Sequence, residues 1–386
     1  MRKEFFAGKN FSGRSEALLT LLRGGALDTD AFFIGPYAEA ALSGLSSNVT
    51  DEMLLYGARP TRMRQVFDQL DIDACQTRKP QSLSGGEQVL LALRCFSQSA
   101  FDTVAVDTAL EQLDEANRAA AFAYLSSRDF NVALIDNRAA PEGWAVTRTN
   151  EASSYAIDWS ALENLVVPQR APEIAIKRLN FAYRGGKTIF RDASTTLSPG
   201  NAYRLYGANG AGKTTLLKIL AGALVPTNSD VTLDGKSYAP WRSGNAALAM
   251  ATQNPDQQWC GATLHEDMIR RRKALGQRAG MLADERLLAL ALALGIASMD
   301  QHLYELPLAA RKRVSWLWPF AGAQPWIVLD EPTVGQDTET RESLAHLLAR
   351  ICSAGYGILF VTHDDGFAAA LPHRVLRVEN SRINSP

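Results

Sequence analysis

The chain has 386 residues, and at roughly 150 residues per domain this length predicts two or three domains. Apolar residues make up 46% and charged residues 21%, values that argue against a disordered or fibrous chain. Forty basic and 41 acidic side chains leave a net charge of −1, so the overall charge gives no reason to expect nucleic-acid binding. The four cysteines form no C-x-x-C pair, which argues against a disulfide framework or a zinc site.

The first residues, MRKEFFAGKNFSGR, are interrupted by charges and glycines, so we expect no signal peptide. The most apolar helical run, Leu287 to Ala297, is much shorter than the ~20 residues that span a bilayer. We therefore expect any membrane role to be exercised from outside the membrane.

The first pattern in chain order is GKNFSGRS, from Gly8 to Ser15. It has the spacing of a phosphate-binding P-loop, with Arg14 where the lysine belongs. Arginine is bulkier and forks its donors, so it does not replace this lysine conservatively. The pattern begins at Gly8, so we expect this copy to lack a β-subdomain before its P-loop. In this copy, Ile34 or Gly35 is expected near the position that corresponds to Gln253 in the second half.

Two further patterns follow in the N-terminal half. SLSGGEQ, at 82–88, is an ordinary turn when taken alone. FDTVAVDTALEQLD, at 101–114, is an apolar strand that runs into Asp107 and Thr108, and Asp136 or Asn137 stands where a histidine occurs in the second half. These features become informative only when the two halves are compared.

A linker and an aromatic residue separate the halves. Residues 151–172 mix polar residues with Pro168 and Pro172 and are predicted to be the linker. Tyr183, in NFAYRGG, is compatible with packing in a strand or with stacking on a base, and we favour stacking.

The strongest local pattern is GANGAGKTT, at 207–215, between an apolar strand and a helical LLKILAGAL. Strand, glycine-rich loop and helix in this order are the context of a P-loop. The glycines let backbone N–H groups converge on phosphate oxygens at a helix N-terminus. Lys213 is expected to reach the β- and γ-phosphates, and the Thr214 hydroxyl is expected to contact Mg²⁺.

The second strong pattern is PWIVLDEPT, in which an apolar strand ends at Asp330 and Glu331. Ligands of α/β sheets bind at the carboxyl ends of the strands. Asp330 suits a contact to a water molecule bound to Mg²⁺, and Glu331 suits a base that polarises the attacking water.

The two halves repeat one another. Leu83 precedes Asp107 by 24 positions, and Leu306, which opens LPLAARKRV, precedes Asp330 by the same number. Each aspartate is followed seven positions later by another aspartate. Two identical spacings indicate an internal duplication.

Together these motifs resemble the ATP-binding cassette (ABC) ATPase family. The resemblance rests on LSGGE at 83–87, the P-loop at 207–215, DEPT at 330–333 and VTHD at 361–364. It implies an α/β fold of two tandem P-loop NTPase cassettes with mainly parallel cores and helical signature subdomains. Residues 1–150 would form a truncated, degenerate cassette, 151–172 the linker, and 173–386 the catalytic cassette.

The resemblance also implies ATP and Mg²⁺ as cofactors. Glu331, His363 and Gln253 would act in hydrolysis, and the metal would be held by Thr214, Gln253 and Asp330. Nucleotide binding is expected from Tyr183, Gly207, Asn209, Gly210, Ala211, Gly212, Lys213, Thr214 and Thr215, and across the cassette pair from Ser84, Gly85, Gly86 and Glu87.

The losses in the two halves are complementary. The C-half signature has Pro307, Leu308 and Ala309 in place of Ser-Gly-Gly, whereas the N-half keeps its signature and has lost the P-loop lysine and the glutamate. In this family, each ATP lies between the P-loop of one cassette and the signature of the other. We therefore expect one hydrolytic site, one degenerate site and an intramolecular cassette pair, with one chain per transporter.

The segment QNPDQQ, at 253–258, resembles the ATPases of energy-coupling-factor (ECF) importers of vitamins or metal ions. The resemblance implies coupling helices of integral membrane subunits docked near Gln253, and a cytoplasmic protein peripheral to the inner face of the cell membrane. We expect no nucleic-acid partner. The alternative is a soluble ABC ATPase of translation or DNA repair, although the long charged linker, coiled coils and cysteine-rich region of those proteins are absent.

Overall fold

The computed structural model describes residues 2–7, 17–18, 21, 31–57, 76–127, 130–136, 140–149, 156–183, 188–208, 210–243, 247–275, 284–296, 298–321 and 324–384. The chain divides into two compact units. The first comprises Met1–Ser153 with Val334–Asp337, and the second comprises Ser154–Thr333 with Thr338–Pro386.

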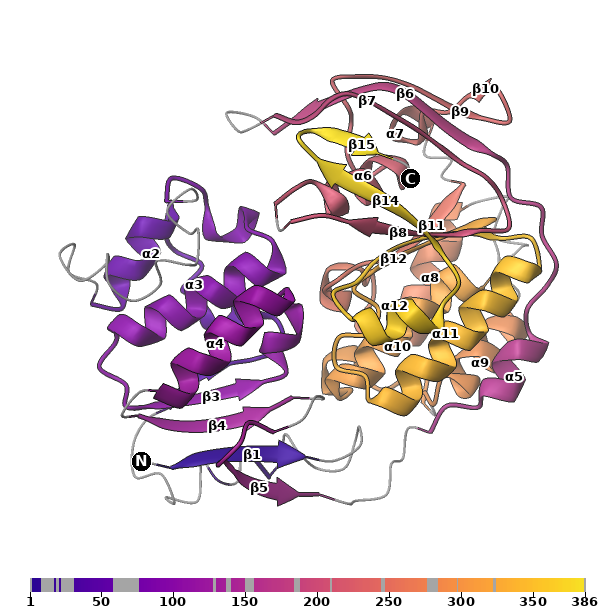
Figure 1. Ribbon diagram of the computed structural model, residues 1–386. Helices are drawn as coiled ribbons and strands as arrows, with labels where there is room; N and C mark the ends of the chain where they lie inside the picture. The colour runs from indigo at the N-terminus through magenta and orange to yellow at the C-terminus, as the bar shows by residue number, and fades with distance from the viewer. Residues whose placement is uncertain are drawn as a thin grey trace. The chain divides into compact units, whose positions relative to one another are not determined.

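The first unit contains a wholly parallel sheet in the order β2-β3-β4-β1-β5, with α3 and α4 lying on one face (Figure 1). The Val- and Ala-rich sequence of β3 is buried along its length, as expected for a central parallel strand covered on both faces. The strands are β1 (Lys3–Ala7), β2 (Ala31–Ile34), β3 (Thr103–Asp107), β4 (Asn131–Ile135) and β5 (Ala145–Arg148), and the helices are η1 (Ala38–Ala41), α2 (Val49–Leu55), η3 (Pro80–Ser82), α3 (Gly85–Gln98), η4 (Ala109–Gln112) and α4 (Glu115–Ser127).

The second unit contains two sheets. The larger has the order β11-β12-β13-β8-β14-β15 and is parallel except for its last pair, and an antiparallel sheet has the order β10-β9-β6-β7. The strands are β6 (Ile174–Ala182), β7 (Thr188–Leu197), β8 (Ala202–Tyr206), β9 (Asn228–Leu233), β10 (Lys236–Ser237), β11 (Leu248–Ala251), β12 (Trp326–Asp330), β13 (Gly357–Val361), β14 (Arg374–Glu379) and β15 (Arg382–Asn384).

The helices of the second unit are α5 (Trp159–Asn164), α6 (Lys213–Leu220), α7 (Pro240–Ser243), η5 (Pro255–Gln257), α8 (Leu264–Leu275), α9 (Asp284–Ala293), η7 (Leu303–Glu305), α10 (Leu308–Phe320), α11 (Thr338–Ser353) and α12 (Asp365–Ala370). Four apolar residues of α6 belong to one buried core with residues of both sheets. The helix that follows the P-loop is therefore held between the two sheets. Within the described residues, no helix is both long enough and apolar enough to cross a membrane.

The two parallel sheets share one strand order. The series β2-β3-β4-β1-β5 corresponds strand for strand to β11-β12-β13-β8-β14. Asp107 pairs with Ile135 in the first unit, and Asp330 pairs with Val361 in the second, in the same register. This agreement supports the duplication inferred from the motif spacings.

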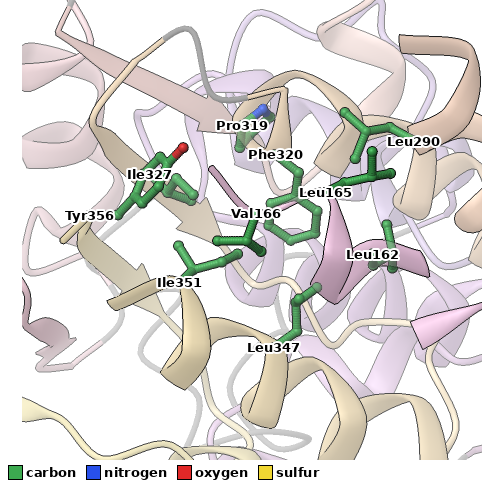
Figure 2. Close-up of a pocket in the computed structure, with 10 residues that line it drawn as sticks. All are labelled: Leu162, Leu165, Val166, Leu290, Pro319, Phe320, Ile327, Leu347, Ile351 and Tyr356. Carbon is green, nitrogen blue, oxygen red and sulfur yellow. The ribbon is translucent and has the colours of Figure 1, made fainter. Parts of the chain in front are cut away.

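The segment 151–172, assigned to the linker in the sequence analysis, contains a helix. Its helix α5 is capped by the Asp158 side chain, which accepts a hydrogen bond from the Ala161 N–H, and it packs against α9 and α11. An apolar pocket lies beside it, lined by residues such as Leu162, Phe320 and Tyr356 (Figure 2). Because its interior has room for about one water molecule, we interpret it as a packing gap and not as a ligand site.

Candidate functional site

The loop between β8 and α6 is shaped by two glycines. A Cβ on Gly207 would lie 2.3 Å from the Val378 carbonyl oxygen, and a Cβ on Gly212 would lie 2.4 Å from Ile189. Gly212 also has a φ of +108°, which L side chains rarely adopt. The glycines of this loop are therefore required by the local fold. Asn209 lies outside the described residues.

Lys213 is the first residue of α6, and its side chain turns back over the loop. The Nζ atom donates hydrogen bonds to the carbonyl oxygens of Gly207 and Ala208 at 2.7 and 3.1 Å. On the same helix, the Thr215 hydroxyl lies 3.1 Å from the Tyr183 hydroxyl. Tyr183 is 46% exposed, so its ring is available beside the loop, as a stacking residue requires.

The acidic pair lies at the carboxyl end of β12, where the sequence predicted it. Asp330 and Glu331 are almost completely buried. Burial, followed by the nearby Glu331 carboxylate, raises the pKa of Asp330 to about 6. The Thr214 hydroxyl and the ammonium group of Lys312 oppose this rise. A buried carboxylate beside a second carboxylate is a position at which added positive charge is favourable.

His363 and Glu331 are brought together. The backbone N–H of His363 donates to Glu331 Oε2 at 3.2 Å, and its Nε2 atom lies 3.6 Å from Glu331 Oε1. The Glu331 backbone has a φ of +46°, and its N–H donates to the Val361 carbonyl at 2.9 Å. Adjacent strands therefore present both side chains at one edge of the sheet.

Gln253 lies just after β11, and the side chain of Lys312 connects its backbone to that of Asp330. Lys312, on α10, donates from Nζ to the carbonyl oxygens of Thr252, Gln253 and Asp330 at 2.8, 2.9 and 3.1 Å. The sequence analysis missed Lys312, because it lies in the segment interpreted only as a decayed signature. Lys312 stands between Arg311 and Arg313 in the sequence, and no local pattern distinguishes it from these two neighbours.

The described residues fit a Mg²⁺ ion. Both carboxylate oxygens of Asp330 are buried, and among the described residues neither accepts a hydrogen bond of normal geometry, although Thr214 is near enough to affect the pKa of the group. Hydroxyl, amide and carboxylate oxygens are the ligand types that Mg²⁺ prefers. Thr214, Gln253 and Asp330 would supply these types.

The retained signature begins helix α3. The Ser84 hydroxyl accepts a hydrogen bond from the Glu87 N–H, and the Ser84 N–H donates to the Glu87 carboxylate at 2.6 Å, which completes a capping box. Arg78 pairs with the same carboxylate at 3.0 Å. Ser84 therefore has a structural role as a helix cap, while Gly85 and Gly86 leave the helix N-terminus without bulky side chains.

The corresponding C-half segment begins α10 differently. Pro307 occupies the N-cap position and supplies no side-chain hydrogen bond. Leu308 and Ala309 follow it and add side chains where Gly85 and Gly86 have none. The start of α10 therefore lacks the hydroxyl that Ser84 supplies at the start of α3, as the sequence indicated.

Other N-half positions can be compared only in part. Gly8 to Ser15, including Arg14, and Asn137 lie outside the described residues. Asp136 is buried and forms an ion pair with Arg118, so it has a structural partner. Ile34 is the last residue of β2, and the sheet register makes Pro36 the counterpart of Gln253, one or two residues after the expected Ile34 or Gly35.

Comparison with known proteins agrees with these motifs. A family model described as ABC transporter matches residues 190–334. The cobalt import ATP-binding protein CbiO of Rhodobacter capsulatus is 32% identical over 222 residues, which cover 55% of this chain and 77% of that protein. A putative ABC transporter ATP-binding protein of Treponema denticola is 23% identical over 357 residues, covering 83% of this chain and 72% of the relative.

Among solved structures, RNase-L inhibitor aligns with 98% of this chain and 85% of its own, with a TM-score of 0.59 and 18% identity, a likeness that concerns the fold alone. The chain spans only 54% and 39% of the lengths of two further curated relatives. The motifs, the repeated strand order and these relatives agree, and the chain belongs to the family of ABC transporter ATP-binding proteins.

Proposed function

We propose that this chain binds and hydrolyses ATP to drive a membrane transporter. The carrying observation is the pair of His363 with the buried Glu331 at the carboxyl end of β12, in the unit that also holds the glycine-rich loop and Lys213. Phosphoryl transfer requires mainly positioning and electrostatic stabilisation. Glu331 would orient the attacking water, His363 would contact the γ-phosphate, and Lys213 would neutralise phosphate charge after leaving its carbonyl partners.

Mg²⁺, held by Thr214, Gln253 and Asp330, would supply charge neutralisation at the phosphates. Tyr183 would stack on the base. Its hydroxyl lies 3.1 Å from Thr215 of the P-loop helix, which supports a place for the ring beside the same nucleotide. These roles assign every retained C-half motif to one site.

We further propose that the signature of the N-half completes this site within the same chain. The support is the complementarity of the losses: Ser84, Gly85 and Gly86 are retained where the other half has Pro307 and its neighbours. The N-terminus of α3, a helix of 14 residues, is suited to an anionic ligand. The second composite site would then be degenerate, with weak or no nucleotide binding.

The transport process that we favour is ECF-like uptake of a vitamin, a metal ion or another small solute. The support is the QNPDQQ segment and the similarity to CbiO, which is named as a cobalt import protein. Membrane subunits would dock near the loop of Gln253. Exposed apolar side chains on the neighbouring elements, including Ile269 at 57% and Tyr304 at 59% exposure, suit such a contact.

The first test measures phosphate release by the purified chain and by Lys213→Ala. We expect Mg²⁺-dependent release by the parent and a loss of about 100-fold or more in the variant, because a phosphate-binding charge is removed. The proposal is contradicted if the parent releases no phosphate above background, both alone and together with its membrane fraction.

Calorimetry with a non-hydrolysable ATP analogue tests the second site. We expect one tight site per chain, and two equal tight sites would contradict the degenerate second site.

A further test distinguishes a transporter subunit from the alternative, a soluble ABC ATPase of translation or DNA repair. The chain is expressed with an affinity tag, and its partners are isolated from detergent-solubilised membranes and from the ribosome fraction. Integral membrane proteins in stoichiometric amounts are the expected result. Stoichiometric ribosomes without membrane proteins would favour a soluble ABC ATPase of translation.

A further inference from the structure

The side chain of Lys312 is completely buried, although it carries an ammonium group. Its Nζ atom makes three hydrogen bonds to backbone carbonyl oxygens, at 2.8, 2.9 and 3.1 Å. An ammonium group has three N–H donors, so these contacts use all of them. The group is therefore fully satisfied, and its position is determined by three separate points of the backbone.

The three carbonyls come from two different strand ends. Thr252 and Gln253 follow β11, whereas Asp330 is the last residue of β12. These strands are parallel neighbours, but the ladder between them ends at Ala251 and Leu329. Beyond that point, Lys312 is a direct connection between the glutamine loop and the acidic residue, and it is provided by a third element, α10.

Two neighbouring contacts hold the same loop against α10. Arg311 pairs with Asp256 at 2.9 Å, and the Gln258 amide donates to the Ser315 carbonyl at 3.3 Å. Neither contact reaches Asp330. Lys312 hydrogen-bonds both to this loop and to the end of β12.

We propose that Lys312 is a positioning residue that sets the separation between Gln253 and Asp330, so that oxygen ligands from two strands face one divalent cation. This inference rests on the proposed function. The ammonium group binds the backbone carbonyls of Gln253 and Asp330, so it does not occupy the side-chain oxygens of these two residues. Its charge also lies near Asp330 and Glu331, which offsets two buried carboxylates.

The repeat supports this assignment. The corresponding residue of α3 is Val89, which is fully buried and whose side chain cannot donate a hydrogen bond. In the first unit the residue after Asp107 is Thr108, and Pro36 is at the position that corresponds to Gln253. The lysine is present in the half that keeps the glutamine and the glutamate, and absent from the half that has lost both.

The test compares the parent with Lys312→Met, which keeps most of the side-chain length but has no donor. Binding of Mn²⁺ to the complex with a non-hydrolysable ATP analogue is measured by electron paramagnetic resonance. Binding of the same analogue without metal is measured by calorimetry. We expect Mn²⁺ affinity to fall about tenfold or more, the size typical of lost outer-shell support, while metal-free nucleotide affinity stays within about threefold.

Leu317→Ala, on the same helix, is the matched control. It removes buried volume without touching the three carbonyls, so it should lower the melting temperature and leave Mn²⁺ affinity within about twofold. If Lys312→Met does not fold, Lys312→Gln, which keeps an N–H donor of shorter reach, is measured in the same way. Its Mn²⁺ affinity should also fall, by a smaller factor.

Parental Mn²⁺ affinity in a folded Lys312 variant overturns the inference. An equal loss of metal-free nucleotide binding also overturns it, because that result indicates general damage to the site. Failure of the parent itself to bind nucleotide would instead contradict the proposed function.

Discussion

The carboxyl ends of β3 and β12 have the same backbone and different chemistry. Thr108 and Glu331, the residues after the strand aspartates, have φ values of +55° and +46°. Both donate their N–H to the neighbouring strand at 2.9 Å, to Ile135 and Val361 respectively. A β-branched threonine is unfavourable in this region of φ and ψ, yet the conformation is kept.

This comparison shows that the scaffold and the charges are separable. The second unit has Asp330, Glu331 and Lys312 buried together, whereas the first has Asp107, Thr108 and Val89 at the matching positions. Losing the lysine alone would leave two buried carboxylates without a compensating charge. The glutamate and the lysine differ between the halves together, which is the pattern that this cost predicts.

The sharpest test of the difference is Glu331→Gln. It removes the water-orienting carboxylate and leaves the phosphate-binding loop intact, so we expect turnover to fall about 100-fold or more. ATP affinity should stay within about threefold. Steady-state phosphate release and calorimetry measure these quantities, and turnover within twofold of the parent would contradict the role of Glu331. Thr108→Glu is the reciprocal variant and should create no second active site.

Mixing of two inactive chains tests whether the halves act within one chain. Lys213→Ala removes the phosphate contact in one protein, and Ser84→Arg blocks the signature in the other. If the composite site forms within a chain, neither protein has an intact site, and the mixture should remain as inactive as each component. Substantial phosphate release on mixing would show that sites form between chains.

The buried acid of the second unit predicts a pH-dependent stability. The pKa of Asp330 is raised to about 6 in the folded protein, whereas an aspartate in the unfolded chain has a pKa near 4. Between these two pH values, the folded protein holds a proton that the unfolded chain has lost. The contribution of Asp330 to stability is therefore largest at low pH and is lost as the pH rises toward 6. At pH 7.5 the buried charge costs on the order of 3 kcal/mol, because the shift of about two pKa units corresponds to about 1.4 kcal/mol per unit.

Asp330→Asn removes this charge. In the absence of metal, it should raise the melting temperature at pH 7.5 by several degrees and have a smaller effect at pH 5. Differential scanning calorimetry at both pH values measures the two shifts. An equal shift at both, or a lower melting temperature at pH 7.5, would contradict the assignment of the raised pKa to this group.

The smallest expected effect compares the starts of α3 and α10. Ser84→Ala removes a helix cap and should cost about 1 kcal/mol of stability, whereas Pro307→Ala removes no side-chain hydrogen bond and should change it by less than about half of that. Chemical denaturation of both variants measures the difference. Equal losses would show that the capping box of Ser84 is not what distinguishes these helices.

Much of the fold followed from local patterns. Two patterns identified strand ends. The glycines at 207–215 indicate a tight turn that other residues cannot adopt, and the apolar run into Asp330 is typical of a buried parallel strand. Equal spacings revealed the duplication, which the common strand order supports. The family could be inferred from four motifs, since each combines a residue type with a position in the fold.

The sequence by itself determined the family, the duplication and which half retains each motif. Only the tertiary structure decided that Lys312 joins the ends of β11 and β12, that Asp136 pairs with Arg118, and that α5 lies within 151–172. The reason is physical: a buried charge is stabilised by partners that folding brings from distant parts of the chain. Lys312 and the Gln253 carbonyl are 59 positions apart, and no local spacing records such a contact.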